Sequence, residues 1–261
     1  MSSLVLTETR DRIARIALNR LDKKNAITVA MYQAMADALR AAEADPQVRV
    51  TLIHGRPDCF CAGNDLKDFV ERPPHAEDAA QSEQAPVWQF LRAISTAAKP
   101  LIAAVGGPAV GIGTTMLLHC DLVYAAPDTR FQLPFVPLGL LPEAGSSLLL
   151  PMIAGYQRAA ELLLLGQPFS AAKALAAGIV TEIVPQDELL EYAQDAASVV
   201  AALPPESVRL TKALMKKRHA VEVAERLAEE SRLFRQRLGS GEAKEAMVAF
   251  FEKRKPDFSR F

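Results

Sequence analysis

Residues that build covalent or metal cross-links are scarce in this sequence. Its 261 residues include three cysteines (Cys59, Cys61 and Cys120) and four histidines. Cys59 and Cys61 are too close in the chain for an ordinary disulfide, and no Cys/His cluster has the spacing of a zinc site. We therefore expect free thiols, as in a cytoplasmic protein, and no metal site.

Charge of one sign and long apolar runs are lacking as well. The 30 Lys and Arg residues nearly balance the 31 Asp and Glu residues, which argues against an electrostatic nucleic-acid binder. No run of about twenty apolar residues could span a bilayer, and the N-terminus has no signal-peptide pattern. We expect a cytoplasmic protein that binds neither nucleic acid nor a membrane. The local run Lys216-Lys217-Arg218 is interpreted as a solvated helix face, with a specific anion site as the alternative.

Apolar periodicity predicts an α/β protein with a helical end. Half of the residues are hydrophobic, which is ample for a core. Strands are expected within residues 2–19 and at 48–54, 101–105, 121–125 and 179–184. Helices are expected after Thr28 and at 86–98, 114–119, 148–154, 158–165, 171–177, 187–202, 205–218, 221–238 and 241–254. This order predicts an α/β core over 1–200 and a helical segment over 201–261.

Two glycine-containing turns offer free backbone donors. Gly111-Ile112-Gly113 follows a predicted strand and opens a short helix, whose first amides have no carbonyl partner inside the helix. Ala62-Gly63-Asn64 follows another strand. If both turns face one point, the amides of Ile112 and Asn64 form an oxyanion hole, the usual arrangement for stabilising a carbonyl oxygen that gains negative charge. A tight connection without a ligand is the alternative.

Several ordered motifs make the sequence resemble the crotonase, or enoyl-CoA hydratase/isomerase, superfamily over nearly its whole length. The motifs are Leu18-Asn19-Arg20, Lys24-Asn25-Ala26-Ile27, Ala62-Gly63-Asn64-Asp65-Leu66, Lys99-Pro100, Gly107-Pro108-Ala109-Val110-Gly111-Ile112-Gly113, Cys120-Asp121, Leu138-Gly139-Leu140 and Gly178-Ile179-Val180. The resemblance implies a spiral core of ββα turns, an acyl-CoA thioester substrate and no permanently bound cofactor. Coenzyme A would enter as part of the substrate.

The same resemblance implies a set of substrate contacts and an assembly. The implied substrate and CoA contacts are Lys24, Ala26, Ala62, Gly63, Asn64, Asp65, Leu66, Gly111, Phe135 and Leu138. Lys24 would meet the CoA phosphates, although a solvated loop explains it equally well. The family buries its helical tail in a homotrimer, often a dimer of trimers. For the apolar positions Leu227, Leu233, Phe234 and Leu238, packing on the chain's own core is the competing interpretation.

One glutamate is the candidate base. The two positions that carry glutamates in enoyl-CoA hydratases hold Thr115 and Phe135, so ordinary hydration is in doubt. Glu143, within Pro142-Glu143-Ala144-Gly145-Ser146-Ser147, resembles the single base of peroxisomal-type Δ3,Δ2-enoyl-CoA isomerases. The resemblance therefore implies a double-bond shift in fatty-acid β-oxidation. The competing interpretation is an ordinary first-turn glutamate stabilised by the helix dipole.

Alternative functions and neighbouring residues complete the set of expectations. Other reactions on this scaffold are hydration, hydrolysis and dehalogenation, and a non-catalytic acyl-CoA-binding protein is the alternative from another class. A wall of Phe135, Val136 and Leu138 is expected to raise the pKa of Glu143. Five further interpretations concern polar residues and a loop. Asp65 is interpreted as a loop cap, Asp121 as structural, His119 as a core residue, Ser146 and Ser147 as caps or site-lining residues, and residues 72–84 as a mobile loop beside the acyl pocket.

Overall fold

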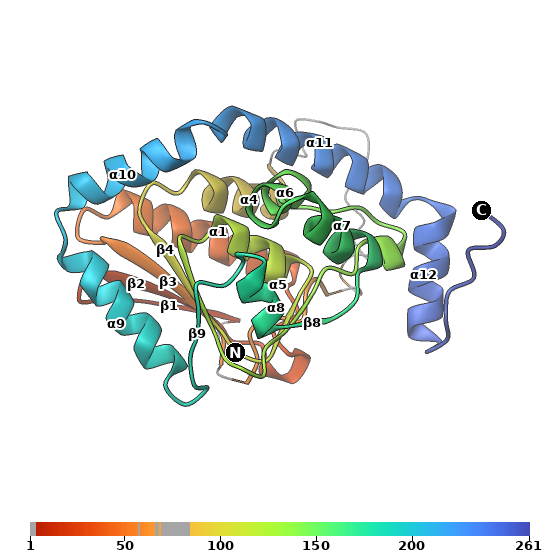
Figure 1. Ribbon diagram of the computed structural model, residues 1–261, viewed down its shortest axis with the longest axis horizontal. Helices are drawn as coiled ribbons and strands as arrows, with labels where there is room; N and C mark the ends of the chain where they lie inside the picture. The colour runs from red at the N-terminus through yellow and green to blue at the C-terminus, as the bar shows by residue number, and fades with distance from the viewer. Residues whose placement is uncertain (1–3, 57, 66–67, 69–83) are drawn as a thin grey trace.

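The computed structural model describes residues 4–56, 58–65, 68 and 84–261 (Figure 1). The substrate contact predicted at Leu66 and the loop predicted over 72–84, except Gln84, lie outside this part of the chain. The first elements are β1 (Val5–Arg10), β2 (Ile13–Leu18), the 3₁₀ helix η1 (Leu21–Lys23), α1 (Val29–Ala44), β3 (Val50–His54), α4 (Pro86–Thr96), β4 (Leu101–Val105), β5 (Pro108–Val110), α5 (Ile112–Thr115) and η2 (Met116–His119). The remaining elements are β6 (Leu122–Ala125), β7 (Arg130–Gln132), η3 (Val136–Leu138), α6 (Ser146–Ala154), α7 (Tyr156–Leu165), β8 (Phe169–Ser170), α8 (Ala171–Ala176), β9 (Glu182–Ile183), α9 (Leu189–Ala202), α10 (Pro205–Lys217), α11 (Ala220–Leu238) and α12 (Gly241–Phe251).

A six-stranded sheet forms the centre of the fold, in the order β1-β2-β3-β4-β6-β9. β1 pairs antiparallel with β2, and the following neighbours pair in parallel. Every residue of β4 is buried, as expected for a central parallel strand covered on both faces. The α/β class predicted from the apolar periodicity is confirmed.

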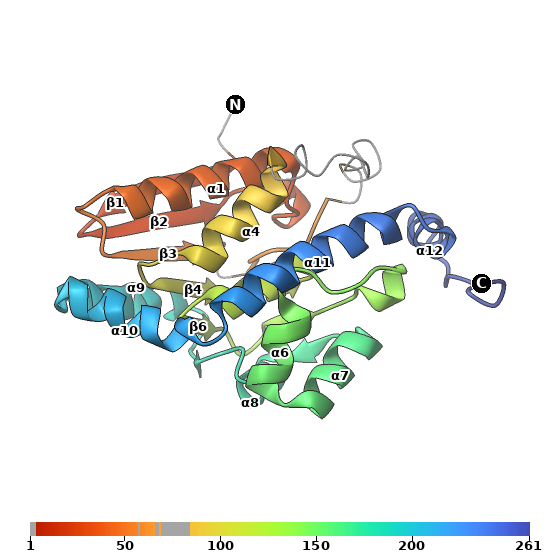
Figure 2. The ribbon, with the colours of Figure 1, turned by 90° about the horizontal axis from the view of Figure 1, so that it is seen from above.

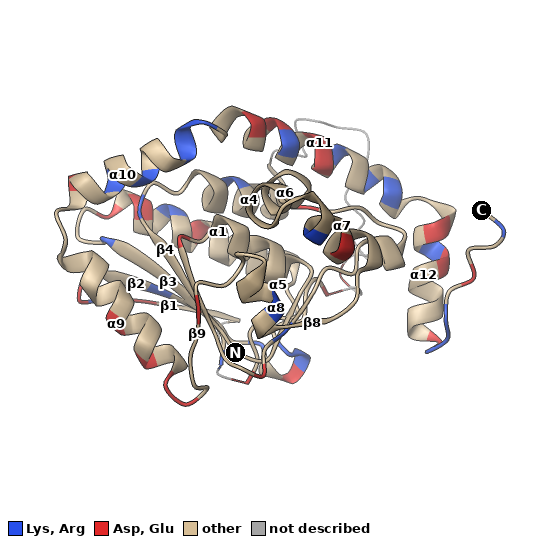
Figure 3. Ribbon diagram, viewed as in Figure 1, with Lys and Arg blue, Asp and Glu red and all other residues tan. Residues whose placement is uncertain are grey.

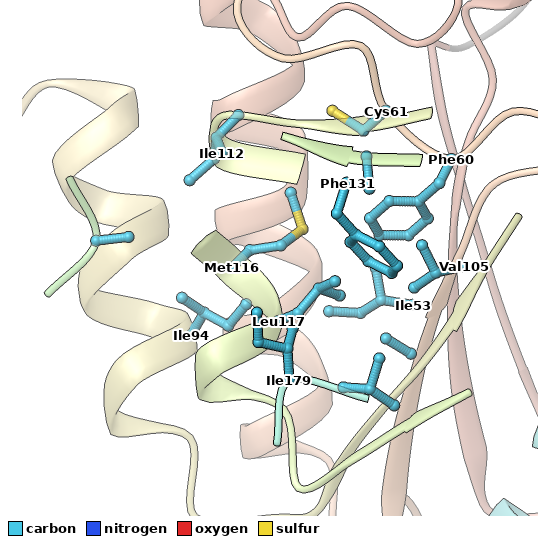
Figure 4. Close-up of a cluster of buried hydrophobic side chains, with 14 of the residues drawn as sticks. Ile53, Phe60, Cys61, Ile94, Val105, Ile112, Met116, Leu117, Phe131 and Ile179 are labelled. Atoms are coloured by element: carbon cyan, nitrogen blue, oxygen red, sulfur yellow. The ribbon is translucent and has the colours of Figure 1, made fainter. Parts of the chain in front are cut away.

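Helices cover both faces of this sheet and create two apolar cores. Alternate strand residues point to opposite faces. Ile53 and Val105 join α1 and α4 in the larger core, whereas Leu52 and Ala104 pack against α9 in the smaller one. Figure 4 shows part of the larger core, with Cys61 and Ile112 at one edge of it.

The structure contains a second, three-stranded sheet that was not predicted from the sequence. Its order is β5-β7-β8, with β5 parallel to β7 and β7 antiparallel to β8. These strands have two or three residues each, too few for an alternating pattern to be visible. Phe131, which precedes a proline-rich segment, thus lies inside β7. The strand expected over residues 179–184 is shortened to Glu182–Ile183.

Several local predictions about helix ends are confirmed. Thr28 caps α1 by accepting a hydrogen bond from the Met31 amide at 3.3 Å, and Ser170 caps α8 by accepting one from the Lys173 amide at 3.2 Å. The short helix expected over residues 114–119 begins two residues earlier, at Ile112, and continues as the 3₁₀ helix η2.

The C-terminal helices pack on the chain's own core. Leu227 and Phe234 on α11 are buried with the larger core, and α11 runs across the top of the molecule in Figure 1 and over α6 in Figure 2. Packing within the chain therefore accounts for these two positions. The predicted trimer stays a prediction, as does the division of the chain at residue 200.

The basic run on α10 is only partly a solvated face. Lys217 and Arg218 are exposed, but Lys216 is half-buried and its Nζ is inaccessible to solvent. One turn earlier, Lys212 is buried and donates to Asp121 at 2.6 Å, while Asp121 also accepts from the Leu101 amide at 2.7 Å. The structural role predicted for Asp121 is confirmed. Within the described residues, no helix is long and apolar enough to cross a membrane.

Candidate active site

The two glycine turns lie side by side. Cys61 pairs with Ala109 in a parallel bridge, with its amide 2.9 Å from the Pro108 carbonyl and its own carbonyl 2.9 Å from the Val110 amide. A Cβ added to Gly113 would lie 2.8 Å from the Cys61 carbonyl oxygen. The turn that carries Asn64 therefore packs directly against the turn that carries Ile112.

The backbone amides of Asn64 and Ile112 are the free donors of these turns. Among the described residues, neither amide donates a hydrogen bond to the backbone or to a side chain, whereas the amides of Ala62, Asp65 and Gly111 all do so. Ile112 is the first residue of α5, where an intrahelical acceptor does not exist. Two unused donors on adjacent turns are the components that an oxyanion hole requires.

A polar loop braces the first turn from its other side. The Asn25 side chain, fully buried, donates to the carbonyls of Cys59 at 3.1 Å and Phe60 at 3.0 Å. Arg20 donates to the Ala26 carbonyl at 2.8 Å and forms an ion pair with Asp65 at 2.7 Å. Asp65 thus joins two loops through Arg20, and the loop cap expected of it from the sequence stays a prediction.

Tyr32 on α1 fixes the side chain of Asn64. Its buried hydroxyl lies 2.5 Å from Asn64 Oδ1. Burial raises the pKa of Tyr32 well above its usual value, with further contributions from nearby Glu143 and Cys61. Tyr32 therefore stays protonated and remains a donor. Tyr32 also shows that α1, Glu143 and the two glycine turns meet in one place. We refer to these two turns, residues 62–64 and 111–113, as the oxyanion turns.

Glu143 lies on a turn before α6. The helix begins at Ser146, so Glu143 is not a first-turn residue, which contradicts the competing interpretation of the sequence. Ala144 and Gly145 both have positive φ, 60° and 71°, and turn the chain sharply into the helix. His119 Nε2 lies 2.8 Å from the Ala144 carbonyl and holds this conformation. Burial lowers the pKa of His119 to about 4, so the ring is neutral and donates through Nε2.

One oxygen of the buried Glu143 carboxyl group lacks a partner in the part of the chain that the structure describes. The residue is 7% exposed, and Oε1 has no hydrogen-bond partner among the described residues. Burial, and secondarily the charge of Glu230, raises the pKa of Glu143 to about 8. A carboxylate with a pKa near neutrality is suited to accept and return a proton.

The expected apolar wall is only partly present. Phe135 is buried and Leu138 half-buried, but Val136 is 42% exposed and cannot shield Glu143 from water. Thr115 is fully buried, and its hydroxyl likewise has no partner among the described residues.

A cavity opens beside the oxyanion turns. Its volume is about 410 Å³, and Leu21, Lys24, Arg56, Asp58, Cys59 and Pro108 line it. Lys24 adopts a left-handed conformation, with φ of 50°, and its carbonyl accepts from the Ala62 amide at 3.0 Å. Lys24 and Arg56 thus bring two cations to this cavity, and Arg56 forms an ion pair at 3.6 Å with Asp58, which also lines it.

Comparison with known proteins identifies the family. The sequence profile described as enoyl-CoA hydratase/isomerase matches residues 8–260. The chain belongs to the enoyl-CoA hydratase/isomerase family. It is 36% identical over 253 residues to human enoyl-CoA delta isomerase 2, covering 97% of this chain and 64% of that protein. It is 34% identical over 258 residues to 2,3-dehydroadipyl-CoA hydratase of Escherichia coli (strain K12), covering 99% of both.

Solved structures of this family share the fold. The structure of Pseudomonas aeruginosa OdaA superposes with a TM-score of 0.90 at 48% identity, covering 95% of this chain and 99% of that one. The crotonase-type fold expected from the motifs is thereby confirmed. The chain spans 64% of the length of the human relative, and the relatives carry both isomerase and hydratase names.

Several residues that support the candidate site were not predicted from the sequence. Glu230 comes from α11, and its carboxylate accepts hydrogen bonds from the turn that follows Glu143. The sequence feature that could have indicated this role is the position of Glu230 between Leu227 and Phe234, on the apolar face of a helix. The support by Arg20, Asn25 and Tyr32 was also missed.

Cysteine chemistry is not a feature of the site. Burial raises the pKa of Cys61 to about 12, so its thiol stays protonated. It accepts a hydrogen bond from the Gly63 amide at 3.4 Å and donates one to the Gly63 carbonyl at 4.0 Å. All three cysteines are free, and the described residues contain no cluster of His, Cys, Asp and Glu that could hold a metal ion.

Proposed function

We propose that the protein is an acyl-CoA enzyme of fatty-acid metabolism that converts 3-enoyl-CoA to 2-enoyl-CoA. The observation that carries this proposal is a single buried carboxyl group, Glu143, beside two unused backbone donors. Its pKa, raised to about 8, suits a group that must both accept and donate a proton at neutral pH.

In the proposed reaction, the thioester oxygen accepts hydrogen bonds from the amides of Asn64 and Ile112. Glu143 removes a proton from the α carbon, and the electron pair delocalises through the adjacent double bond onto the thioester oxygen as a dienolate. The protonated Glu143 then returns the proton to the γ carbon, and the double bond moves into conjugation. One base suffices because both carbons lie on one face of the substrate.

The outer cavity supports the choice of a CoA ester. Lys24 and Arg56 line it next to Pro108, at the start of β5. Two cations near the mouth suit the phosphates of coenzyme A, while the buried Phe135 suits the acyl chain. In this proposal the remaining predicted contacts, Ala26, Ala62, Gly63 and Gly111, present backbone to the substrate.

Hydration is the second candidate. The buried Thr115 hydroxyl and Glu143 Oε1 both lack partners among the described residues, and a water molecule bound to both would be oriented for addition to a 2-enoyl-CoA. Thr115 cannot supply a second carboxylate, so Glu143 would have to activate this water alone. This is why we favour the isomerase reaction.

The test presents each substrate separately. Purified protein should convert 3-hexenoyl-CoA to the conjugated 2-enoyl thioester, followed by its absorbance, and should form little 3-hydroxyacyl-CoA from 2-hexenoyl-CoA. Glu143→Gln should lower isomerisation about 10²–10⁴-fold. The control is Glu225→Gln, an equal charge change at an exposed position of α11. Formation of only the 3-hydroxy product would establish hydration, and binding of acyl-CoA by calorimetry without turnover would establish a non-catalytic protein.

A further inference from the structure

Glu230 is a buried acidic residue far from the catalytic motifs in the sequence. It lies on α11, which passes over α6 in Figure 2, and it is 3% exposed. Its neighbours on the same face, Leu227 and Phe234, pack in the larger core. A carboxyl group buried on an apolar helix face costs stability unless it is hydrogen-bonded, so its partners must compensate.

The hydrogen-bond partners of Glu230 among the described residues come from the start of α6. Oε2 accepts from the Gly145 amide at 2.6 Å, and Oε1 accepts from the Ser147 amide at 2.9 Å and from the Ser147 hydroxyl at 2.5 Å. Arg226, one turn earlier on α11, donates to that hydroxyl at 3.4 Å, which orients the Ser147 proton toward Glu230. Three donors directed at one carboxyl group suit its ionised form.

These donors are the ones that Glu143 would otherwise use. The free amides at a helix N-terminus attract the nearest carboxylate, and such a contact stabilises its ionised form. Glu143 lies two residues before Gly145, the N-cap of α6. Because Glu230 occupies the amides of Gly145 and Ser147, Glu143 is left with an unpartnered Oε1.

We propose that Glu230 is the positioning residue of the base: it caps α6 in place of Glu143 and thereby keeps the Glu143 carboxyl group free for the substrate. This role rests on the proposed function of Glu143 as the base. Glu230 itself touches neither the two oxyanion turns nor the CoA cavity in the described part of the chain.

The charged surroundings of Glu143 agree with this role. The titratable groups that face it are Tyr32 from α1, Cys61 from the first oxyanion turn and Glu230 from α11. Burial raises the pKa values of Tyr32 and Cys61, so both stay neutral. His119, which holds Ala144, is neutral because burial lowers its pKa to about 4. Burial raises the pKa of Glu230 above its usual value, while the hydrogen bonds from Ser147 and Gly145 and the charge of Arg226 oppose this rise. When ionised, Glu230 adds to burial in raising the pKa of Glu143.

The test is a comparison of Glu230→Gln with Glu230→Asp. In Glu230→Gln the negative charge is lost and one cap amide meets the amide nitrogen of glutamine, so Glu143 can take the cap. We expect a fall of about tenfold or more in the plateau kcat/KM, and an acid limb of the pH profile displaced to lower pH. Glu230→Asp keeps the negative charge but moves it farther from the start of α6, because the aspartate side chain is shorter. The acid limb of its pH profile should therefore lie between those of Glu230→Gln and the parent. Glu225→Gln, on the exposed side of α11, should change neither quantity.

A direct titration separates this proposal from the proposed function. The ¹³C signal of the Glu143 carboxyl, assigned by its loss in Glu143→Gln, reports its pKa whatever reaction is catalysed. A lower Glu143 pKa in Glu230→Gln, or in Glu230→Asp if the first variant does not fold, supports the proposal. An unchanged pKa and acid limb in a folded variant would overturn it. Retained activity in Glu143→Gln would instead remove Glu143 as the base and leave the titration result standing.

Discussion

Two buried glutamates, Glu143 before α6 and Glu245 on α12, have opposite surroundings. They are 7% and 6% exposed. Glu245 accepts from Arg254 at 2.5 Å, from Arg260 at 2.8 Å and from the Asp257 amide at 2.9 Å. Hydrogen bonding from Arg254 lowers the pKa of Glu245 to about 2, whereas burial raises that of Glu143 to about 8.

The comparison separates a structural carboxylate, Glu245, from the proposed base, Glu143. Cationic partners hold Glu245 in its charged form, and it fastens residues 254–260 to α12, which projects to one side in Figure 2. Figure 3 shows both signs of charge along α11 and α12 and none on α5. Burial is thus shared by the two glutamates, and the partners decide whether the proton can move at neutral pH.

The largest expected effect is the pH dependence of the reaction. In the proposed reaction Glu143 is a base only when ionised, and its pKa is raised to about 8. The kcat/KM for 3-enoyl-CoA should therefore rise with pH and level off above about 8, and at pH 6 it should be about 100-fold below the plateau. Initial rates between pH 5.5 and 9.5 measure this. A half-maximal rate near pH 4.5 would mean that the pKa of Glu143 is not raised, and this would contradict the difference drawn between Glu143 and Glu245.

The second largest effect is expected from adding a methyl group at a glycine, either between the oxyanion turns or next to α12. Gly113→Ala places a methyl group 2.8 Å from the Cys61 carbonyl and should push the two oxyanion turns apart, lowering kcat/KM about tenfold or more. The matched change Gly239→Ala, just before α12, meets its nearest atom at 3.6 Å and should leave kcat/KM unchanged. Equal losses in both variants would indicate general destabilisation, which thermal unfolding would show.

A smaller effect is expected from Tyr32→Phe. This change removes the donor to Asn64 Oδ1, a contact of about 1 kcal/mol, so kcat/KM should fall about fivefold. Tyr192→Phe is the matched control, because that hydroxyl donates to Glu182 at the surface. The kcat/KM values of the two variants, measured at one pH with one substrate, should differ. Identical values would show that Tyr32 does not hold the turn that contains Asn64.

The smallest catalytic effect is expected from Glu245→Gln. The variant loses the charge that holds Arg254 and Arg260, so the segment over 252–261 should become more sensitive to limited proteolysis, detected by mass spectrometry. Its kcat/KM should equal that of the parent. A loss of tenfold or more would mean that α12 and the site at Glu143 are coupled.

Motifs in the sequence predicted much of the fold and the position of the candidate base. The order of strands and helices, the caps at Thr28 and Ser170 and the two glycine turns could all be read from local patterns. The short sheet β5-β7-β8 could not, because strands of two or three residues carry no periodicity. Chemical roles were predicted from motifs, and they remain predictions for experiment.

The surroundings of Glu143 could not be predicted, because they come from distant parts of the chain. Its burial depends on α1 and α11, which contribute Tyr32 and Glu230. Val136, expected to shield it, faces solvent because η3 turns that side chain outward. A charged residue on an apolar helix stripe, such as Glu230, was the available signal, and its partner depends on tertiary contacts.

The bond from Gly145 to Glu230 joins residues 85 positions apart. During synthesis, the ribosome has therefore made both glycine turns and Glu143 well before it delivers α11. A nascent chain that stops short of α11 lacks the cap of α6, and its amides are open to Glu143. Completion of this turn therefore waits for a segment made 85 residues later, so the surroundings of Glu143 are assembled only after α11 has left the ribosome.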